Sequence, residues 1–147
     1  SKHIMEKLFY EASRNYRKTK FCCVRYGNVL GTTGSVITIW ETQIKERKSL
    51  TVTDKRMTRF FFTLDDSIDL IFHAIKHTKS GETFVQKMPS KNIYVMAQEI
   101  SKGKVSIDII GLRPGEKLHE TLIADYEGEE YTSDKASNKK QIVTLYK

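Results

Sequence analysis

Several absences narrow the possibilities first. Cysteine occurs only at Cys22 and Cys23, and neighbours on a strand point to opposite faces, so these thiols are not expected to bridge. This argues against a disulfide framework or a cysteine-based zinc site and fits a reducing cytoplasm. No apolar run approaches the roughly 20 residues that a membrane-spanning helix needs. We see no signal peptide, and we expect a cytoplasmic protein without a membrane span.

Two binding signatures are missing as well. There is no G-x-G-x-x-G motif, and no glycine-rich strand–turn–helix stands at the front of the sequence. His73 and His77 have the four-residue spacing of metal ligands on a helix, but no cysteine or third histidine accompanies them. Asp69 is the one further candidate ligand. We therefore expect no metal site here.

Charge of one sign is in moderate excess. The 147 residues carry 25 Lys and Arg against 18 Asp and Glu, a net charge of +7 at pH 7. Cations that gather at a helix C-terminus are favoured by the helix dipole, which accounts for much of the clustering. No aromatic-interleaved basic stripe accompanies them, so we expect no nucleic acid as partner. A basic protein that contacts nucleic acid stays a minor alternative.

Hydrophobic periodicity predicts helices that alternate with strands, which favours an α/β fold. Ser35 is expected to cap one helix, and Thr63–Asp66 has the pattern of a capping box that opens another. Helices are expected over about 2–16, 35–48, 64–80, 93–100 and 116–123, and strands over 21–26, 50–54, 60–63, 83–87, 105–110 and 141–146.

The same pattern predicts a loop, a mobile segment and the inward face of one helix. Residues 27–34 are expected to form a glycine-punctuated loop, and the polar segment 125–140 is expected to be mobile. The helix after Thr63 is expected to place four apolar side chains inward: Ile68, Ile71, Phe72 and Ile75.

The first dense stretch is Arg25–Gly31, where a strand end runs into a glycine loop. Ligands of open α/β sheets bind beyond the carboxyl ends of strands, so Asn28 could donate its amide to a ligand oxygen. The alternative is that Asn28 tolerates a turn conformation and bonds its own backbone.

The second dense stretch is Arg56–Thr63. An arginine that enters an apolar strand is costly to desolvate unless it is paired, and its planar fork suits phosphate oxygens. The alternative is a salt bridge to Asp54, Asp65 or Asp66.

The third dense stretch is Gly111–Lys117. Pro114 and Gly115 fit the central positions of a type II turn, which would hold Arg113 just ahead of an expected helix. An arginine at a helix N-terminus is a natural anion site, and Glu116 could accept both hydroxyls of a ribose. The alternative is a turn followed by a carboxylate that merely favours the helix dipole.

Taken together, these motifs resemble the C-terminal half of extended short-chain dehydrogenase/reductases. The resemblance is closest to nucleotide-sugar 4,6-dehydratases of polysaccharide biosynthesis, of the UDP-N-acetylglucosamine type. Six motifs follow one another in family order and with family-like spacing, from the first residue to about Ile123. They are Val24–Gly31, Gly34–Ile37, Leu50–Asp54, Met57–Phe61, Lys87–Ser90 and Ile110–Glu120.

The resemblance also implies roles for particular residues. Ser1 and Lys2 match the end of the Tyr-x-x-x-Lys signature, so Lys2 would be the catalytic lysine that binds the nicotinamide ribose. Arg59 and Arg113 would hold the pyrophosphate of UDP, and Glu116 would bind the uridine ribose. The remaining substrate-binding residues would be Asn28 at the phosphate or sugar and Ser35, Val36 and Thr51 along the nucleobase.

The resemblance further implies the fold and domain organisation. Residues 1–33 would be the end of a Rossmann-type nucleotide-binding domain. Residues 34–147 would mainly form a small mixed α/β domain that binds the sugar nucleotide, with 65–90 packing back on the Rossmann part. One departure is Thr38, which stands where the family commonly has proline.

The implied reaction needs NADP or NAD, a base near the C4 hydroxyl of the sugar and an acid at the C6 hydroxyl. The catalytic tyrosine should precede Lys2 by four residues, and the cofactor glycines should lie further upstream. We therefore expect this chain to be the sugar-nucleotide-binding portion of such an enzyme, truncated and inactive alone. Expected partners are a UDP-sugar and either a missing N-terminal half or a homo-oligomer partner. Alternatives are a free-standing UDP-sugar-binding module and one half of a split enzyme.

Overall fold

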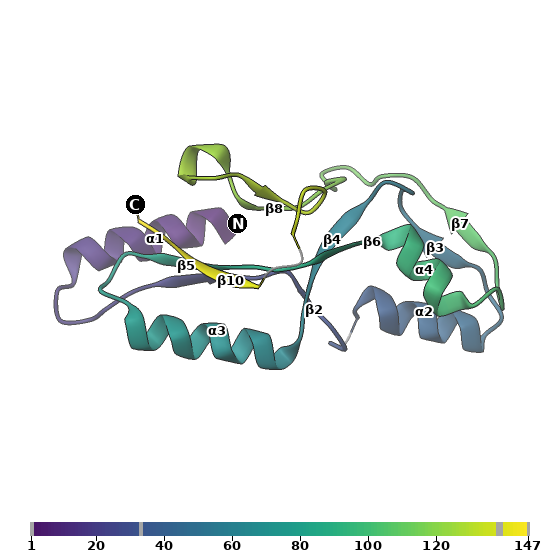
Figure 1. Cartoon of the computed structure of the whole chain (residues 1–147), viewed down its shortest axis with the longest axis horizontal. Coiled ribbons are helices and arrows are strands. Elements are labelled where there is room, and N and C mark those ends of the chain that lie inside the picture. Colours follow the sequence, from purple (N-terminus) through teal and green to yellow (C-terminus); the bar gives the residue numbers. More distant parts are fainter. Residues whose placement is uncertain (1, 33, 138–139, 147) are drawn as a thin grey trace.

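The structure, a computed structural model, describes residues 2–32, 34–137 and 140–146. The chain forms an elongated molecule with two lobes joined by extended strands (Figure 1). In chain order its elements are α1 (Lys2–Asn15), β1 (Cys23–Arg25), β2 (Asn28–Val29), α2 (Val36–Lys45), β3 (Leu50–Val52), β4 (Thr58–Phe62), α3 (Leu64–His77), β5 (Thr83–Lys87), β6 (Ser90–Asn92), α4 (Ile93–Ser101), β7 (Ile107–Ile109), β8 (Thr121–Ile123), the 3-10 turn η1 (Asp125–Glu127), β9 (Tyr131–Thr132) and β10 (Gln141–Leu145).

The first lobe is built on the three-stranded sheet β1-β5-β10, with β5 at its centre. β1 pairs with β5 in parallel, with Cys23 opposite Thr83, and β10 pairs with β5 antiparallel, with Val143 opposite Val85. Helix α3 packs against β1 and β5. Because β5 has a neighbour on both sides and a helix over one face, Phe84 and Val85 are buried in the first core.

The second lobe is built around Trp40 of α2, which is fully buried. Its indole Nε1 donates to the Thr51 carbonyl of β3 at 2.9 Å, so the largest side chain of this core leaves no unpaired donor. β3 pairs with β7 in parallel, with Leu50 opposite Ile107. Met96 and other side chains of α4 complete this core.

Strand β4 connects the two lobes. It pairs with β2 in parallel and with β6 antiparallel. Phe60 and Phe62 enter the first core, whereas Phe61 packs against the second. Gly27 lies so close to β4 that an added Cβ would stand 2.4 Å from the Phe60 Cβ, so only glycine fits there.

The predicted helix starts are confirmed. The Ser35 hydroxyl accepts from the Thr38 N–H at the start of α2, and Thr63 and Asp66 form a reciprocal capping box at the start of α3. The expected order of strands and helices is also confirmed up to α4, apart from the short strands β2 and β6. β2 lies inside the stretch expected to be a loop, because Asn28 and Val29 pair with β4.

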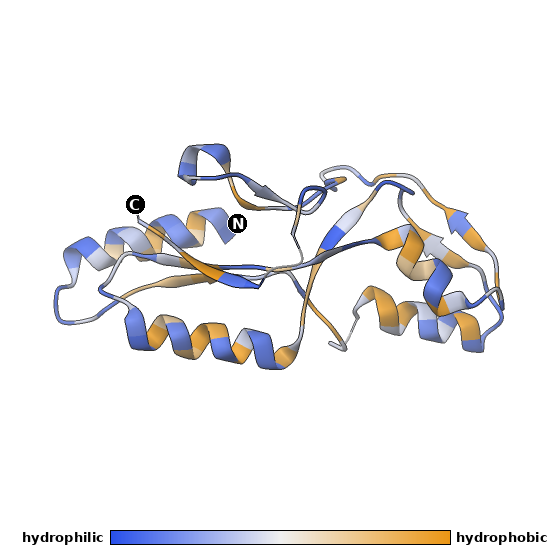
Figure 2. Cartoon of the chain, viewed as in Figure 1, coloured by the Kyte–Doolittle hydropathy of each residue, from blue (hydrophilic) through white to orange (hydrophobic). Residues whose placement is uncertain are grey.

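The prediction of which side chains of α3 face inward is wrong. The side chains that face the sheet are Ser67, Leu70 and Ala74, and two of these are small enough for close approach of the helix to the sheet. The apolar arc of α3 is broader than its contact with the sheet, so periodicity did not identify the buried part (Figure 2). The four residues expected inside are exposed: Ile68, Ile71, Phe72 and Ile75.

The predicted helix over 116–123 is also wrong. The chain runs as an extended loop from Glu116 and then forms β8, which pairs with β9. Segment 125–140 holds more structure than its composition indicated, since Tyr131 and Ser133 are buried. Residues 138 and 139 of that segment, like Ser1, lie outside the described residues. The mobility of the segment and the proposed domain division stay predictions.

An ionic staple joins three separate elements of the first lobe. Arg25 of β1 makes two hydrogen bonds to each of the carboxylates of Glu6 in α1 and Glu127 in η1, at 2.6–2.7 Å, and one to the Leu122 carbonyl at 2.9 Å. The bonds to Glu127 and Glu6 raise the pKa of Arg25. The side chains of Glu6 and Glu127 are only 17% and 6% exposed, so both depend on this counter-charge.

We expect Arg25→Ala to destabilise the fold by about 3–5 kcal/mol, because it leaves nearly buried carboxylates without their main cation. Urea denaturation followed by circular dichroism measures this change. The control is Arg56→Ala, which breaks the pair with Asp54 on the surface and should change the midpoint little. Equal effects of the two substitutions would contradict a structural role for the staple.

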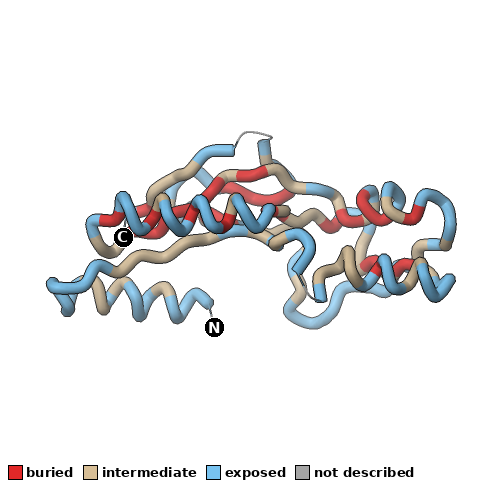
Figure 3. The backbone as a smooth tube through the Cα atoms, turned by 90° about the horizontal axis from the view of Figure 1, so that it is seen from below, coloured by how far each residue is buried: buried red, intermediate tan, exposed pale blue. Residues whose placement is uncertain are grey.

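We also expect the 147-residue chain to self-associate through α3. Phe72 and Ile75 are 66% and 64% exposed, and Figure 3 shows this face of α3 as largely exposed. Phe72→Lys with Ile75→Lys should shift the chain toward monomer in light scattering, whereas Asp69→Lys on another face of the helix should not. A monomeric parent chain would contradict this expectation.

Candidate functional site

The candidate site lies where the two lobes meet, on the loop 113–120 beside the ends of β3 and β4. The predicted turn at its start is confirmed, because Glu116 N donates to the Arg113 carbonyl at 3.0 Å. Gly115 has a φ of +80°, which a type II turn requires at this position and glycine adopts without strain. The turn holds Arg113 exposed at the surface.

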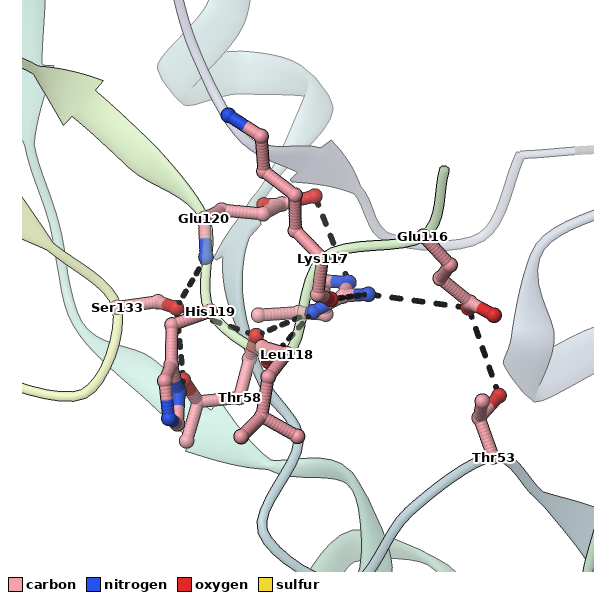
Figure 4. Close-up of polar contacts among 9 residues, drawn as sticks. Thr53, Thr58, Glu116, Lys117, Leu118, His119, Glu120 and Ser133 are labelled. Atoms are coloured by element: carbon pink, nitrogen blue, oxygen red, sulfur yellow. Dashed lines mark hydrogen bonds and ion pairs between the residues drawn. The ribbon is translucent and has the colours of Figure 1, made fainter. Parts of the chain in front are cut away.

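The carboxylate of Glu116 is held by groups from three segments, and Figure 4 shows its contact with Thr53. It accepts from the Arg113 N–H at 3.2 Å and from the Thr53 hydroxyl at 3.5 Å. The third group is the guanidinium of Arg59, whose Nη2 lies 3.8 Å from Glu116 Oε1. Arg59 and Glu116, far apart in sequence, are therefore brought together by the fold, and Arg113 meets Glu116 through its backbone N–H.

Arg59 is largely committed to the loop backbone. Its Nη1 donates to the Thr58 and Leu118 carbonyls at 2.8 and 3.0 Å, and its Nη2 donates to the Lys117 carbonyl at 2.8 Å. The side chain is only 12% exposed. A guanidinium has five N–H donors, so three serve carbonyls and the others face carboxylates. These bonds explain why no helix forms here, since the carbonyls of Lys117 and Leu118 bind Arg59 instead of helical N–H groups.

Two of the three alternative partners that the sequence offered for an arginine here, Asp54 and Asp66, are otherwise engaged. Asp54 pairs with Arg56, whose hydrogen bonds lower the pKa of Asp54 to about 2. Asp66 binds Lys140 and closes the capping box of α3. Arg59 instead faces Glu116 and Glu120, the latter 3.5 Å from its Nε.

Glu120 is the carboxylate at the end of the loop. Burial raises its pKa, while Arg59, the Phe60 N–H, Lys2 and Lys117 act in the opposite direction. The charge of Lys2, on α1, thus reaches the same carboxylate as that of Arg59.

A buried hydroxyl network fixes the far end of the loop. The Thr58 hydroxyl lies 2.7 Å from both His119 Nδ1 and the Ser133 hydroxyl, and Ser133 Oγ accepts from the Glu120 N–H at 2.8 Å. Ser90 also donates to the Ser133 carbonyl. Because Ser133 is almost fully buried, the network ties the loop to β4 and to the segment after β9.

A large cavity lies next to this cluster, between α1, β1 and the segment that includes β8 and η1. It has a volume of about 1060 Å³, and its walls include Lys2, Tyr26, Lys117 and Leu122. Arg59, Arg113 and Glu116 do not line it. Among the described residues of loop 113–120, Lys117 is the only one that does.

The other predicted site residues are spread along the second lobe and its entry. Thr51, two residues before Thr53 on β3, is bonded to Gln43 of α2. Ser35 caps α2, and Val36 packs against the second core. Asn28 is exposed on β2. The described contacts do not join Ser35, Val36 or Asn28 to the Glu116 cluster.

Three residues near the site were not singled out from the sequence. Thr53 and Glu120 contact Glu116 and Arg59, and Lys117 reaches the cavity. All three lie inside motifs that carry the family resemblance, and Lys117 directly follows Glu116. Their contacts depend on the extended course of the loop, which the expected helix would have changed.

Neither a metal-binding cluster nor a membrane-spanning helix is found among the described residues. Among the described residues, no group of three or more His, Cys, Asp and Glu side chains is arranged to hold a metal ion. Within the same residues, no helix combines the length and apolar character that crossing a bilayer needs.

Comparison with known proteins agrees with this fold. Residues 1–142 match the family model described as polysaccharide biosynthesis protein. A UDP-glucose 4-epimerase of Rickettsia bellii is 46% identical over 132 residues, which is 86% of this chain and 39% of that protein. One of Rickettsia felis is 44% identical with the same coverage. The chain thus spans about two fifths of the length of these relatives.

Solved structures give the same result. Pen from Bacillus thuringiensis superposes with a TM-score of 0.79 at 37% identity, covering 90% of this chain and 51% of that one. A UDP-glucuronic acid 4-epimerase of Bacillus cereus superposes with a TM-score of 0.64 at 23% identity, covering 77% and 39%. The second likeness concerns the fold alone.

The mixed α/β architecture is therefore that of the C-terminal part of an extended short-chain dehydrogenase/reductase. Within this class, the chain belongs to the polysaccharide biosynthesis protein family.

We expect Arg59→Lys to destabilise the protein by on the order of 2–3 kcal/mol, since lysine cannot replace three carbonyl contacts from one planar group. Amide hydrogen exchange should show lost protection near residues 117–120, and chemical denaturation should show the loss of stability. The control is Arg113→Lys, whose exposed side chain makes no such contacts. Unchanged amide hydrogen exchange in Arg59→Lys would contradict the conclusion that Arg59 holds the loop.

Proposed function

We propose that the chain is the sugar-nucleotide-binding portion of an enzyme that oxidises C4 of a UDP-sugar, of the UDP-N-acetylglucosamine 4,6-dehydratase type. The single observation that supports this most is that the fold brings the Arg59 guanidinium to the Glu116 carboxylate, which also accepts from the Arg113 N–H. A planar cation can bind a pyrophosphate, and a carboxylate can accept two ribose hydroxyls.

In this proposal, the exposed Arg113 binds the pyrophosphate of UDP. Arg59 keeps its three carbonyl bonds and offers the Nη2 donor that now faces Glu116. Glu116 accepts the ribose hydroxyls, and its departure from Arg59 frees that donor for a phosphate oxygen. The nucleobase lies along Ser35, Val36 and Thr51, and Asn28 contacts the phosphate or sugar from β2.

Hydride transfer at C4 would be supplied by NADP or NAD in the complete enzyme. The described residues do not fit a whole dinucleotide. Gly27, which follows β1, is pressed against Phe60, so it serves strand packing and not the approach of a pyrophosphate. Lys2 lines the large cavity and is the residue we propose for the nicotinamide ribose. No reaction step is assigned to this chain alone, and we expect it to be inactive by itself in a cytoplasmic setting.

A second candidate is 4-epimerisation, because the relatives from Rickettsia bear the name UDP-glucose 4-epimerase. Both reactions begin with oxidation at C4. A complete enzyme that contains this portion distinguishes them by its product from UDP-N-acetylglucosamine. A 4-keto-6-deoxy sugar supports the dehydratase, whereas a C4 epimer supports the second candidate.

We expect Arg113→Ala to weaken UDP binding by roughly 10- to 100-fold, since hydrogen bonds to charged groups contribute about 1.5–3 kcal/mol. Glu116→Ala should weaken uridine and UDP alike while leaving inorganic pyrophosphate unaffected. Calorimetric titration into the 147-residue chain measures all three ligands. Arg59→Ala with Arg113→Ala should be non-additive, because both side chains would contact one group.

The matched control is Lys104→Ala, an exposed cation in the second lobe, which should bind UDP as the parent does. UDP binding by Arg113→Ala and Glu116→Ala that equals the parent would refute the site. The turn and the ion pairs around Arg59 would then be purely structural.

A further inference from the structure

Loop 113–120 and the large cavity meet at one residue. Lys117 is bound at its carbonyl by Arg59 and lines the cavity with its side chain. Figure 4 shows this side chain extending away from Glu116. Lys2, at the start of α1, lines the same cavity. The loop therefore presents the Glu116 carboxylate on one side and the Lys117 side chain on the other.

The charges around the loop are unbalanced. Four cationic side chains, Lys2, Arg59, Arg113 and Lys117, accompany the two carboxylates Glu116 and Glu120. Among these six groups the cations exceed the carboxylates by two, while the opposite wall of the cavity carries Glu6, Asp125, Glu127 and Glu130. The described part of the chain offers the Lys117 ammonium no hydrogen-bond or ion-pair partner.

The carboxylates on the other wall of the cavity are held by groups other than Lys117. Glu6 and Glu127 are both bound by Arg25, and Glu130 pairs with Lys135 at 3.4 Å. The Asp125 carboxylate accepts from the Tyr126 N–H. These groups lie on α1 and the segment after β8, whereas Lys117 enters from the loop.

We infer that Lys117 binds the sugar-side phosphate of the sugar nucleotide and directs the sugar into the cavity beside Lys2. This inference rests on the proposed function. The nucleoside lies at Glu116 and Thr53, the diphosphate crosses the loop past Arg113, and its second phosphate meets the Lys117 ammonium. Arg59 acts on this contact as a positioning residue, because it holds the Lys117 carbonyl and sets where the side chain begins.

The test is calorimetric titration of UDP, uridine and inorganic pyrophosphate into the parent chain, Lys117→Ala and Lys117→Arg. We expect Lys117→Ala to weaken UDP and pyrophosphate about 10-fold or more and to leave uridine unchanged. The UDP affinity of Lys117→Ala should also depend less steeply on salt concentration than that of the parent. Lys117→Arg should restore most of the affinity, since the positive charge is kept. Thermal stability should not change, because Arg59 binds only the backbone carbonyl of Lys117 and not its side chain.

Lys104→Ala is the matched control for the loss of one exposed lysine. UDP binding by Lys117→Ala as tight as the parent's would overturn the inference. An equal loss of uridine and UDP would overturn it too, since Lys117 would then act through the loop. If the parent binds pyrophosphate through Lys117 but binds no uridine, the nucleotide proposal fails and the anion contact stands. A parent that binds none of the three ligands overturns both.

Discussion

The alternation of side chains along β4 is the constraint on which the rest of the structure depends. Successive residues of a strand point to opposite faces, so Phe60 and Phe62 enter one core while Phe61 packs against the other. Thr58 shares the face of Phe60, and Arg59 shares that of Phe61. A shift of register by one residue would exchange both cores and would turn Arg59 away from the loop. The strand that joins the lobes therefore also positions the candidate site.

The same arginine explains why the site is only partly visible in the sequence. Motifs indicated Arg59, Arg113 and Glu116, and the turn at Pro114–Gly115 was predicted from its residues alone. The extended course of the chain after Glu116 was not predicted, because the Arg59 guanidinium binds the carbonyls of a segment almost sixty residues away. Local propensity contains no information about such a partner, and it therefore favoured a helix.

Elements with strong local signals were predicted well. The capping box at Thr63 and Asp66 depends only on neighbours, and so does the cap at Ser35. The buried face of α3 depends on what the sheet presents. The helix carries apolar residues around more than half of its circumference, and the fit of Ser67 and Ala74 against β1 and β5 selects one part. Periodicity reports how apolar a helix is, whereas packing decides which residues are covered.

The position of β5 at the centre of the first sheet has a consequence for the order of folding during synthesis. β1 finds its partner sixty residues later, at Thr83, and the first core is complete only with Leu145 of β10. The second core is complete once Leu118 has been made. During synthesis the first core is therefore completed after the second. Until β10 has been made, β5 keeps one unpaired edge, whereas all residues of the Trp40 core are already present.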